Sequence, residues 1–262
     1  MISMEEAKII EGFVYEAGQI LLSAKPGEAE VYKKDGPANF ATFFDVKIQE
    51  FLIGKLSERF EGAGFFGEED TQGNAQKVSP GYTFFIDPID GTTNFMFDYH
   101  NSCVSLGLSE GNGMIGGWVY DPYKDRMFSA LRGHGAFLNG IRLHIENRPM
   151  SEGIVAFGCA RYNEGDRIFS VLKELFMNSL SLRNGGSAAI DLCRIAAGSN
   201  IAYVEMKIQP YDYAAASVII EESGGFIGQA DGSPITIDGP CSIVAGTKKA
   251  ASQIRGILSG AQ

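Results

Sequence analysis

The sequence predicts an α+β fold of two packed halves, and three observations support this prediction. Apolar residues recur at helical spacing in two segments near the start of the chain, which predicts two amphipathic helices. Three strand-like segments joined by tight turns follow and predict an antiparallel sheet. Strand-like and helix-like segments then alternate to the end of the chain. We place the boundary between the halves in the polar stretch around Arg148-Pro149, which gives units of residues 1–147 and 148–262.

The first half begins with a helix predicted over residues 4–24 and ended by Pro26-Gly27. Residues 31–39 are expected to form a polar loop. A second helix runs to Phe60 after Thr42, and Asp45 falls in its first turn, where the helix dipole favours a carboxylate. The strands predicted in this half cover residues 63–66, 82–86, 103–109, 114–120 and 126–131, and the segment 133–140 extends the meander through a turn at Asn139-Gly140.

The second half alternates strands with helices, and glycines end two of these helices. The predicted strands cover residues 154–157, 179–182, 201–205 and 241–245, and the predicted helices cover residues 166–177, 187–197, 212–223 and 248–258. Such alternation is typical of a sheet that is covered by helices.

The composition is that of an ordinary globular protein and argues against several classes of partner. A formal net charge of -10 disfavours a nucleic-acid partner, because nucleic-acid-binding proteins usually carry a basic face. No apolar run approaches the roughly 20 residues of a membrane-spanning helix. The first residues also lack a signal-peptide pattern, so we expect a cytoplasmic protein without a membrane partner. The four cysteines are widely scattered, which predicts buried free thiols rather than a zinc site or disulfides.

The segment 84–95 combines an apolar strand with two carboxylates. Asp87 and Asp90 enter a predicted turn marked by a proline and a glycine, where they would repel each other unless a cation lay between them. Their hard oxygen ligands suit Mg²⁺. The backbone N–H groups of Gly91 and Thr92, at a predicted helix start, suit a phosphate. The alternative is a surface turn with solvated acids, because Asp-Pro and Asp-Gly pairs are common in turns.

Three further segments allow both a structural and a chemical interpretation. Glu68, Glu69 and Asp70 are adjacent acids, which commonly form a solvated cluster on a surface loop. The glycines and serine of residues 184–189 open a helix and predict either a plain cap or an anion site. Asp212 follows a proline at a helix start, where an acid commonly serves as a cap. Taken alone, each pattern leaves both interpretations open.

The segment Asp87-Pro88-Ile89-Asp90-Gly91-Thr92-Thr93-Asn94-Phe95 resembles the signature of the inositol monophosphatase family of Mg²⁺-dependent, lithium-sensitive phosphatases. Similar segments extend from Lys34 to about Gly225. The resemblance implies a layered αβαβα sandwich, with an antiparallel sheet in the first half and a mixed sheet in the second. It also implies a small phosphorylated substrate and a homodimer.

The resemblance assigns metal ligands by position. Glu68, Asp87 and the Ile89 carbonyl would bind the first of two or three Mg²⁺ ions. Asp87, Asp90 and Asp212 would bind the second, so that Asp87 bridges the two. The four acids are therefore expected to meet in space, where cations would relieve their repulsion.

The resemblance also assigns the residues that take part in the attack of water on the phosphate. The Thr92 hydroxyl and Glu68, with Asp45 behind Thr92, would orient and deprotonate a water molecule. No covalent phosphoenzyme is expected, because no activated nucleophile is apparent. The residues implied in substrate binding are Asp90, Gly91, Thr92, Ser187, Ala188 and Glu205, and Lys34 and Glu69 have supporting roles.

Some positions depart from the family pattern. Lys207 and Gln209-Pro210 depart from its inositol-specific form and leave the substrate open. The other departures are Phe43-Phe44, Asp70 and Tyr211, the last at a place where tryptophan is usual. Inositol 1-phosphate is the favoured substrate, and fructose 1,6-bisphosphate, histidinol phosphate and nucleotide or dinucleotide phosphates are the alternatives. Arg161 and Arg183 would bind a second phosphate or serve as surface ion-pair residues. A regulatory or binding subunit that retains the fold is the alternative from another class.

Overall fold

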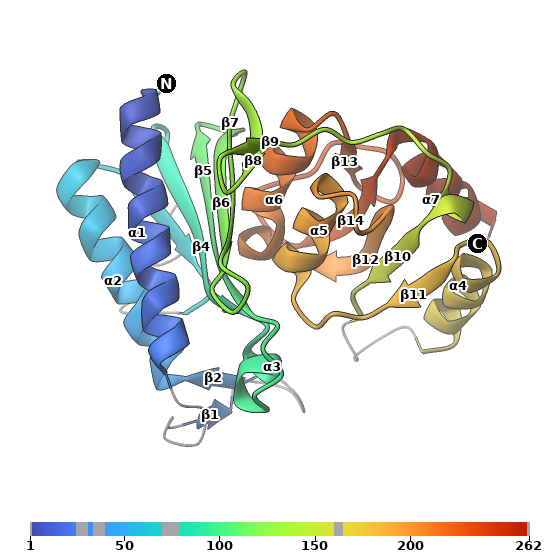
Figure 1. Cartoon of the computed structure of the whole chain (residues 1–262), viewed down its shortest axis with the longest axis horizontal. Coiled ribbons are helices and arrows are strands. Elements are labelled where there is room, and N and C mark those ends of the chain that lie inside the picture. Colours follow the sequence, from blue (N-terminus) through green and yellow to red (C-terminus); the bar gives the residue numbers. More distant parts are fainter. Residues whose placement is uncertain (1, 25–30, 34–39, 70–78, 160–164, 261–262) are drawn as a thin grey trace.

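The chain folds into five layers in the order helices, sheet, helices, sheet, helices (Figure 1). This computed structural model describes residues 2–24, 31–33, 40–69, 79–159 and 165–260. The three helical layers are the pairs α1 (Met4–Ser23) with α2 (Phe43–Arg59), α5 (Ala188–Ala196) with α6 (Pro210–Glu222), and α4 (Gly165–Met177) with α7 (Lys248–Gly260). The αβαβα sandwich implied by the family resemblance is confirmed.

The first sheet lies between the helix pair α1 and α2 and the central helices. Its strands are ordered as in the sequence: β3 (Gly64–Gly67), β4 (Tyr82–Asp90), β5 (Cys103–Glu110), β6 (Gly113–Asp121), β7 (Arg126–Leu131), β8 (Gly135–Leu138) and β9 (Ile141–Arg142). From β4 to β9 every pair is antiparallel, as predicted. The edge pair β3–β4 is parallel, because a long connection rather than a hairpin joins these strands.

The second sheet is mixed, as predicted, with the order β11-β10-β12-β14-β13. Strand β10 (Ile154–Phe157) pairs in parallel with β11 (Ser181–Arg183) and with β12 (Ala202–Ile208). Strand β14 (Cys241–Gly246) is antiparallel to β12 and to β13 (Phe226–Gly228).

Several short elements differ from the predictions. Strands β1 (Val31–Lys33) and β2 (Phe40–Thr42) pair where a loop was expected, and β13 was not predicted. The 3-10 helix η2 (Met150–Glu152) lies just beyond the predicted boundary between the halves. The short helix α3 (Thr92–Met96) begins where the glycine and threonines predicted a helix start.

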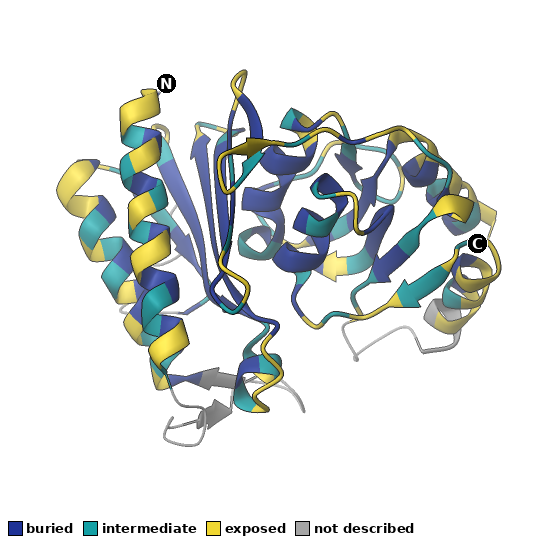
Figure 2. Ribbon diagram, viewed as in Figure 1, coloured by how far each residue is buried: buried dark blue, intermediate teal, exposed yellow. Residues whose placement is uncertain are grey.

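Helix α6 is buried on almost all sides because it packs between the two sheets (Figure 2). Two glycines permit its close contact with the first sheet: a Cβ on Gly117 would lie 2.1 Å from the Ala215 carbonyl oxygen, and one on Gly107 would lie 2.8 Å from the Ala214 Cβ. One apolar cluster consequently joins side chains from both predicted halves, such as Phe85 and Ile219. Helix α1, by contrast, buries one face only, as its spacing predicted.

The cysteines agree with the prediction except at one position. All four are free, and Cys103, Cys193 and Cys241 are buried, but Cys159 is exposed because it follows the end of β10. None of the helices in the described ranges is long and apolar enough to cross a membrane.

Candidate functional site

The carboxyl end of β4 carries the two acids of the signature segment. The predicted turn at Asp87 to Asp90 is wrong, because the strand continues through Asp90. In the pairing with β5, Asp87 lies opposite Ser105 and Asp90 lies opposite Cys103. Between these two pairs, β4 advances by three residues while β5 advances by two. This is a β-bulge, which accommodates a proline that cannot donate to the ladder. The bulge directs both carboxylates toward one place without ending the strand.

Asp87, Asp90 and Asp212 form one acidic group, with one oxygen of each within 4.8 Å of the others. Burial raises the pKa of Asp87 well above its usual range, and the negative charges of Glu68, Asp90 and Asp212 raise it further. The pKa of Asp212 is raised by burial and then by the charge of Asp90. A compact group of acids with raised pKa values indicates a site that a cation would stabilise.

Asp90 joins the first sheet to helix α5. Its Oδ2 accepts hydrogen bonds from the Ser187 hydroxyl at 2.6 Å and from the Ala189 N–H at 2.7 Å, and its Oδ1 accepts one from the Ala188 N–H at 3.2 Å. These donors belong to the first turn of α5, whose dipole also favours a negative charge. Burial nevertheless outweighs them and raises the pKa of Asp90 to about 6.

Asp212 lies in the first turn of α6. The Gln209 N–H donates to its Oδ2 at 3.2 Å, and Pro210 occupies the first turn. The capping interpretation of the sequence therefore describes this residue correctly. It does not exclude the chemical one, because the same carboxyl also belongs to the group with Asp87 and Asp90.

A second acidic group combines Asp45, Glu68 and Glu69, whose oxygens also lie within 4.8 Å of one another. The buried Gln49 side chain positions this segment, because its Nε2 donates to the Glu69 carbonyl at 2.7 Å and its Oε1 accepts from the Glu69 N–H at 3.0 Å. A Cβ on Gly67 would lie 2.3 Å from that Oε1. The negative charge of Glu68 raises the pKa values of Asp87 and Asp212, so the two acidic groups interact electrostatically.

Thr92 stands between the two groups. Its hydroxyl is 3.4 Å from the Asp45 Oδ1 and 3.1 Å from the Ile89 carbonyl oxygen, so it can donate a hydrogen bond to either oxygen. The Asp45 Oδ2 accepts from the Thr42 hydroxyl at 2.5 Å and from the Thr42 N–H at 2.7 Å. This capping box fixes a fully buried carboxylate directly behind Thr92.

A cavity of about 250 Å³ opens beside the first acidic group. Its lining includes Ser187, Ala188 and Glu205, all three predicted to bind substrate. The Tyr203 hydroxyl donates to the Glu205 Oε2 at 2.5 Å. Burial raises the pKa of Glu205 to about 7. Within the described part of the chain, this cavity is lined by no lysine or arginine.

A polar network that the sequence did not predict holds the loop before α5. Asn94 and Asn101 each donate to the Gly185 carbonyl at 2.8 Å, and the Gly185 N–H donates to Asp191 at 3.0 Å. Arg194 donates to both Asp191 and Asn101, at 2.8 and 2.7 Å. The network fixes the position of the cavity wall relative to the first sheet. Asn94 was within the quoted signature, but its Gly185 partner is 91 positions away, a contact that leaves no local signal.

Some predicted residues cannot be placed in the site. Lys34, Asp70 and Arg161 lie outside the described residues. Arg183 is described, and its guanidinium donates to the Ser181 hydroxyl at 2.5 Å and to the Leu182 carbonyl at 2.7 Å. It does not line the cavity beside the acids.

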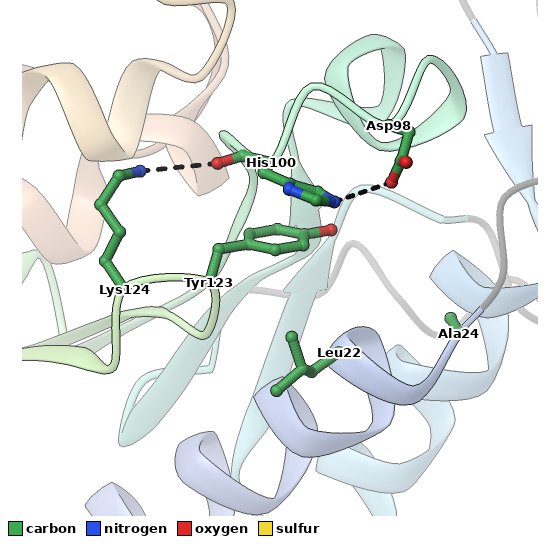
Figure 3. A pocket seen from close by; sticks show the side chains of 6 residues that line it. All are labelled: Leu22, Ala24, Asp98, His100, Tyr123 and Lys124. Carbon is green, nitrogen blue, oxygen red and sulfur yellow. Dashed lines mark hydrogen bonds and ion pairs between the residues drawn. The ribbon is translucent and has the colours of Figure 1, made fainter.

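A second cavity, of about 390 Å³, lies beyond α3 and is a separate feature (Figure 3). His100 stacks on Tyr123 there, with ring centroids 4.9 Å apart, and its Nε2 lies 2.8 Å from the Asp98 Oδ1. Both members of the His100–Asp98 pair are exposed, so the pair contributes little to the stability of the fold. The residues that line this cavity are Leu22, Ala24, Asp98, His100, Tyr123 and Lys124, and they include none of the predicted site residues.

The donor set of the first acidic group fits a hard divalent cation. The Asp87 Oδ1 is buried and has no hydrogen-bond partner among the described residues. A buried carboxylate oxygen without a donor is costly unless a cation binds it. Three carboxylates and the nearby Ile89 carbonyl offer the oxygen ligands that Mg²⁺ prefers.

Comparison with known proteins gives a consistent result over nearly the whole chain. The model of the inositol monophosphatase family matches residues 4–260. The inositol-1-monophosphatase of Bacillus subtilis is 34% identical over 242 residues, which cover 91% of each protein. Inositol monophosphatase 1 of Bos taurus is 32% identical over 245 residues, which cover 91% of this chain and 88% of the bovine protein.

Solved structures share the fold. The extragenic suppressor protein suhB of Bartonella henselae superposes with a TM-score of 0.89, at 26% identity and 97% coverage of both chains. A Staphylococcus aureus inositol monophosphatase, SaIMPase-II, has been solved with inositol monophosphate bound and with 2'AMP bound. These two structures give TM-scores of 0.79 and 0.82, each at 26% identity, with 97% of this chain and 93% of the other covered.

Proposed function

This chain belongs to the inositol monophosphatase family and is a phosphomonoester hydrolase, and we propose that it hydrolyses an inositol monophosphate to inositol and inorganic phosphate. The observation that supports this most strongly is the group of Asp87, Asp90 and Asp212 beside a cavity whose lining includes Glu205. The acids suit a cation-bound phosphate, and Glu205 offers a hydrogen-bond acceptor to a polyol. The substrates in the names of the Bacillus and bovine relatives point in the same direction.

We propose that the family's metal dependence is met here by two or three Mg²⁺ ions. Glu68, Asp87 and the Ile89 carbonyl would hold the first, and Asp87, Asp90 and Asp212 the second. When bound, such ions clamp phosphate oxygens, lower the pKa of water and stabilise the charge of the leaving oxygen. The same resemblance predicts inhibition by Li⁺.

The protein's own groups would orient the attacking water. The Thr92 hydroxyl can donate to Asp45 and accept a hydrogen bond from water, so that a proton can pass from the water toward the buried carboxylate. Glu68, in the adjacent acidic group, would share this task. The N–H groups of Gly91 and Thr92 would bind phosphate oxygens. Water would then attack the phosphorus directly, without a covalent enzyme intermediate.

The groups proposed to bind the inositol ring are Ser187, Ala188 and Glu205. In this structure Ser187 and Ala188 donate to Asp90, so they would bind the substrate next to a metal ligand that they also orient.

A nucleotide monophosphate is the second candidate substrate, because a related structure holds 2'AMP. Phosphate release from inositol 1-phosphate, 2'AMP, fructose 1,6-bisphosphate and histidinol phosphate, with Mg²⁺ present or chelated and with Li⁺ added, would decide between them. We expect inositol 1-phosphate to give the highest kcat/KM, chelation to stop release and Li⁺ to inhibit. Release from none of these substrates would favour a regulatory subunit.

Substitution of one acid tests the assignment of the site. Asp90→Asn should lower kcat at least about a hundredfold, because it removes a charge that binds the cation. Asp231→Asn is the matched control, since that carboxylate is exposed and bonds only to Ser233 among the described residues. Full activity in Asp90→Asn would refute the assignment.

We also propose a cytoplasmic homodimer, as the family resemblance and the unpaired cysteines suggest. Large apolar side chains exposed on and after α4 are candidates for the contact between copies: Phe169, Phe176, Met177 and Leu180, each at least 60% exposed. Light scattering should give twice the chain mass for the wild type and a smaller mass for Phe169→Lys. An unchanged mass for this variant would place the contact elsewhere.

A further inference from the structure

The Glu205 carboxylate is held in one orientation by two neighbours that no sequence pattern singled out. Tyr203 and Glu205 are two positions apart on β12, so their side chains share one face of the strand. The Tyr203 side chain is only 1% exposed, and its hydroxyl donates to the Glu205 Oε2 at 2.5 Å. One carboxylate oxygen is therefore occupied before any substrate binds.

Gly158 also confines this pair of side chains. Its N–H donates to the Val204 carbonyl at 3.0 Å, so the backbone lies directly beside β12. A Cβ on Gly158 would lie 2.1 Å from the Glu205 Oε2 and 2.5 Å from the Tyr203 hydroxyl oxygen. Real Cβ atoms do not approach other atoms so closely, so any larger residue must displace the pair. Only glycine allows the two side chains to occupy their observed positions.

The second carboxylate oxygen remains available to the cavity. The Glu205 Oε1 accepts no hydrogen bond from the described residues, and Glu205 lines the cavity beside Asp212 and Ser187. A single acceptor of fixed orientation can select a ligand that places a hydroxyl in one position. A carboxylate free to rotate would select less well, because it would lose side-chain entropy on binding.

We propose that Tyr203 and Gly158 determine the substrate preference of this site by fixing the orientation of Glu205. The inference rests on the proposed function, since it concerns how the leaving group of a phosphate ester is selected. Tyr203 acts through Glu205 and is thus a positioning residue. A leaving group with a hydroxyl in reach of the Oε1 is favoured over one without it.

The test compares two esters that differ in their leaving groups. Inositol 1-phosphate carries ring hydroxyls, and p-nitrophenyl phosphate carries none. In Tyr203→Phe the ratio of their kcat/KM values should fall about tenfold, mainly through the KM of inositol 1-phosphate. Gly158→Ala should lower the ratio in the same direction. Tyr120→Phe, which removes another buried tyrosine hydroxyl 2.8 Å from a carboxylate oxygen of Asp125, should leave the ratio unchanged.

A double-mutant cycle separates positioning from a general structural effect. If Tyr203 acts through Glu205, adding Tyr203→Phe to a Glu205→Ala variant, which has no side-chain acceptor, should change the ratio less than about twofold. A tenfold effect that persists in that background would overturn the inference, and so would equal losses on both esters. If the wild type prefers 2'AMP to inositol 1-phosphate, the proposed substrate fails, whereas the same ratio measured with 2'AMP still tests Tyr203 through the sugar hydroxyls.

Discussion

Chelation of divalent cations should make this protein lose stability as the pH rises. In the fold, burial raises the pKa of Asp90 from 3.8 to about 6, although three hydrogen bonds favour its charged form. Between these two pH values the folded chain keeps a proton that the unfolded chain has released. The free energy of unfolding therefore falls as the pH rises through this window, which is the reverse of the effect of a salt-bridged carboxylate.

The magnitude follows from the size of the pKa shift. A rise of about two units corresponds to about 3 kcal/mol over the whole titration. Of this, about 1.4 kcal/mol is lost between pH 5 and pH 7.5, and the remainder is lost below pH 5. The pKa values of Asp87 and Asp212 are raised as well, so the loss calculated for Asp90 alone is a lower bound for the total loss of stability.

Urea unfolding at several pH values between 5 and 7.5, with EDTA or with Mg²⁺, would measure this effect. We expect the EDTA samples to lose stability toward pH 7.5. We expect Mg²⁺ to stabilise the protein most at pH 7.5, because cations bind the deprotonated carboxylates. In EDTA, Asp90→Asn should reduce the loss of unfolding free energy between pH 5 and pH 7.5 by about 1.4 kcal/mol, and Asp231→Asn should leave that loss unchanged. A wild type that is equally or more stable at pH 7.5 in EDTA would refute the reasoning.

Three other outcomes can be measured directly. Thr92→Val should lower kcat by about 10²–10³ with little change in KM, and Thr92→Ser should restore most of it, because we propose that the hydroxyl beside Asp45 orients the attacking water. Gly117→Ala should lower the free energy of unfolding by about 3 kcal/mol or more, because its Cβ would meet the Ala215 carbonyl. Gly54→Ala is the control, because a Cβ there would have no atom within 4 Å, and this variant should be neutral or raise the free energy of unfolding by up to about 1 kcal/mol. Dialysis against EDTA should abolish phosphate release and added Mg²⁺ should restore it, as measured with a phosphate dye; release that persists after chelation would contradict the proposed metal dependence.

The long helices and strands could be predicted because apolar residues recur within each of them at the spacing typical of that structure. Helix α1 shows one apolar face over twenty residues, and the hairpin between β5 and β6 is marked by a glycine-rich turn. Short elements carry no such signal: β13 has three residues, and its place in the sheet depends on pairing with β14. The prediction failed at Pro88 for another reason. Proline and glycine usually mark a turn, but here a β-bulge places the proline inside a paired strand.

The acids of the site were found one by one, but their partners were not. Asp87 and Asp90 stand out in the sequence because they are close together, and Asp212 was assigned to the site by family resemblance alone, although its position at a helix start had also predicted a cap. Nothing local indicates that the hydroxyl of Ser187 would donate to Asp90, since these residues are 97 positions apart. The bond between Arg194 and Asn101 was invisible for the same reason, at a separation of 93. Such contacts depend on how the two sheets pack, which no single segment encodes.

The position of α6 between the sheets connects the stability of the core to the geometry of the acids. Asp212 is in the first turn of this helix, so its distance from Asp87 depends on how closely the helix lies on β6. Gly117 permits that close contact. The apolar face of α6 supplies the free energy that brings the acids together, because their own burial opposes folding while no cation is bound. A change that loosens α6 on the first sheet, such as Gly117→Ala, should therefore weaken cation binding even at temperatures where the protein remains folded.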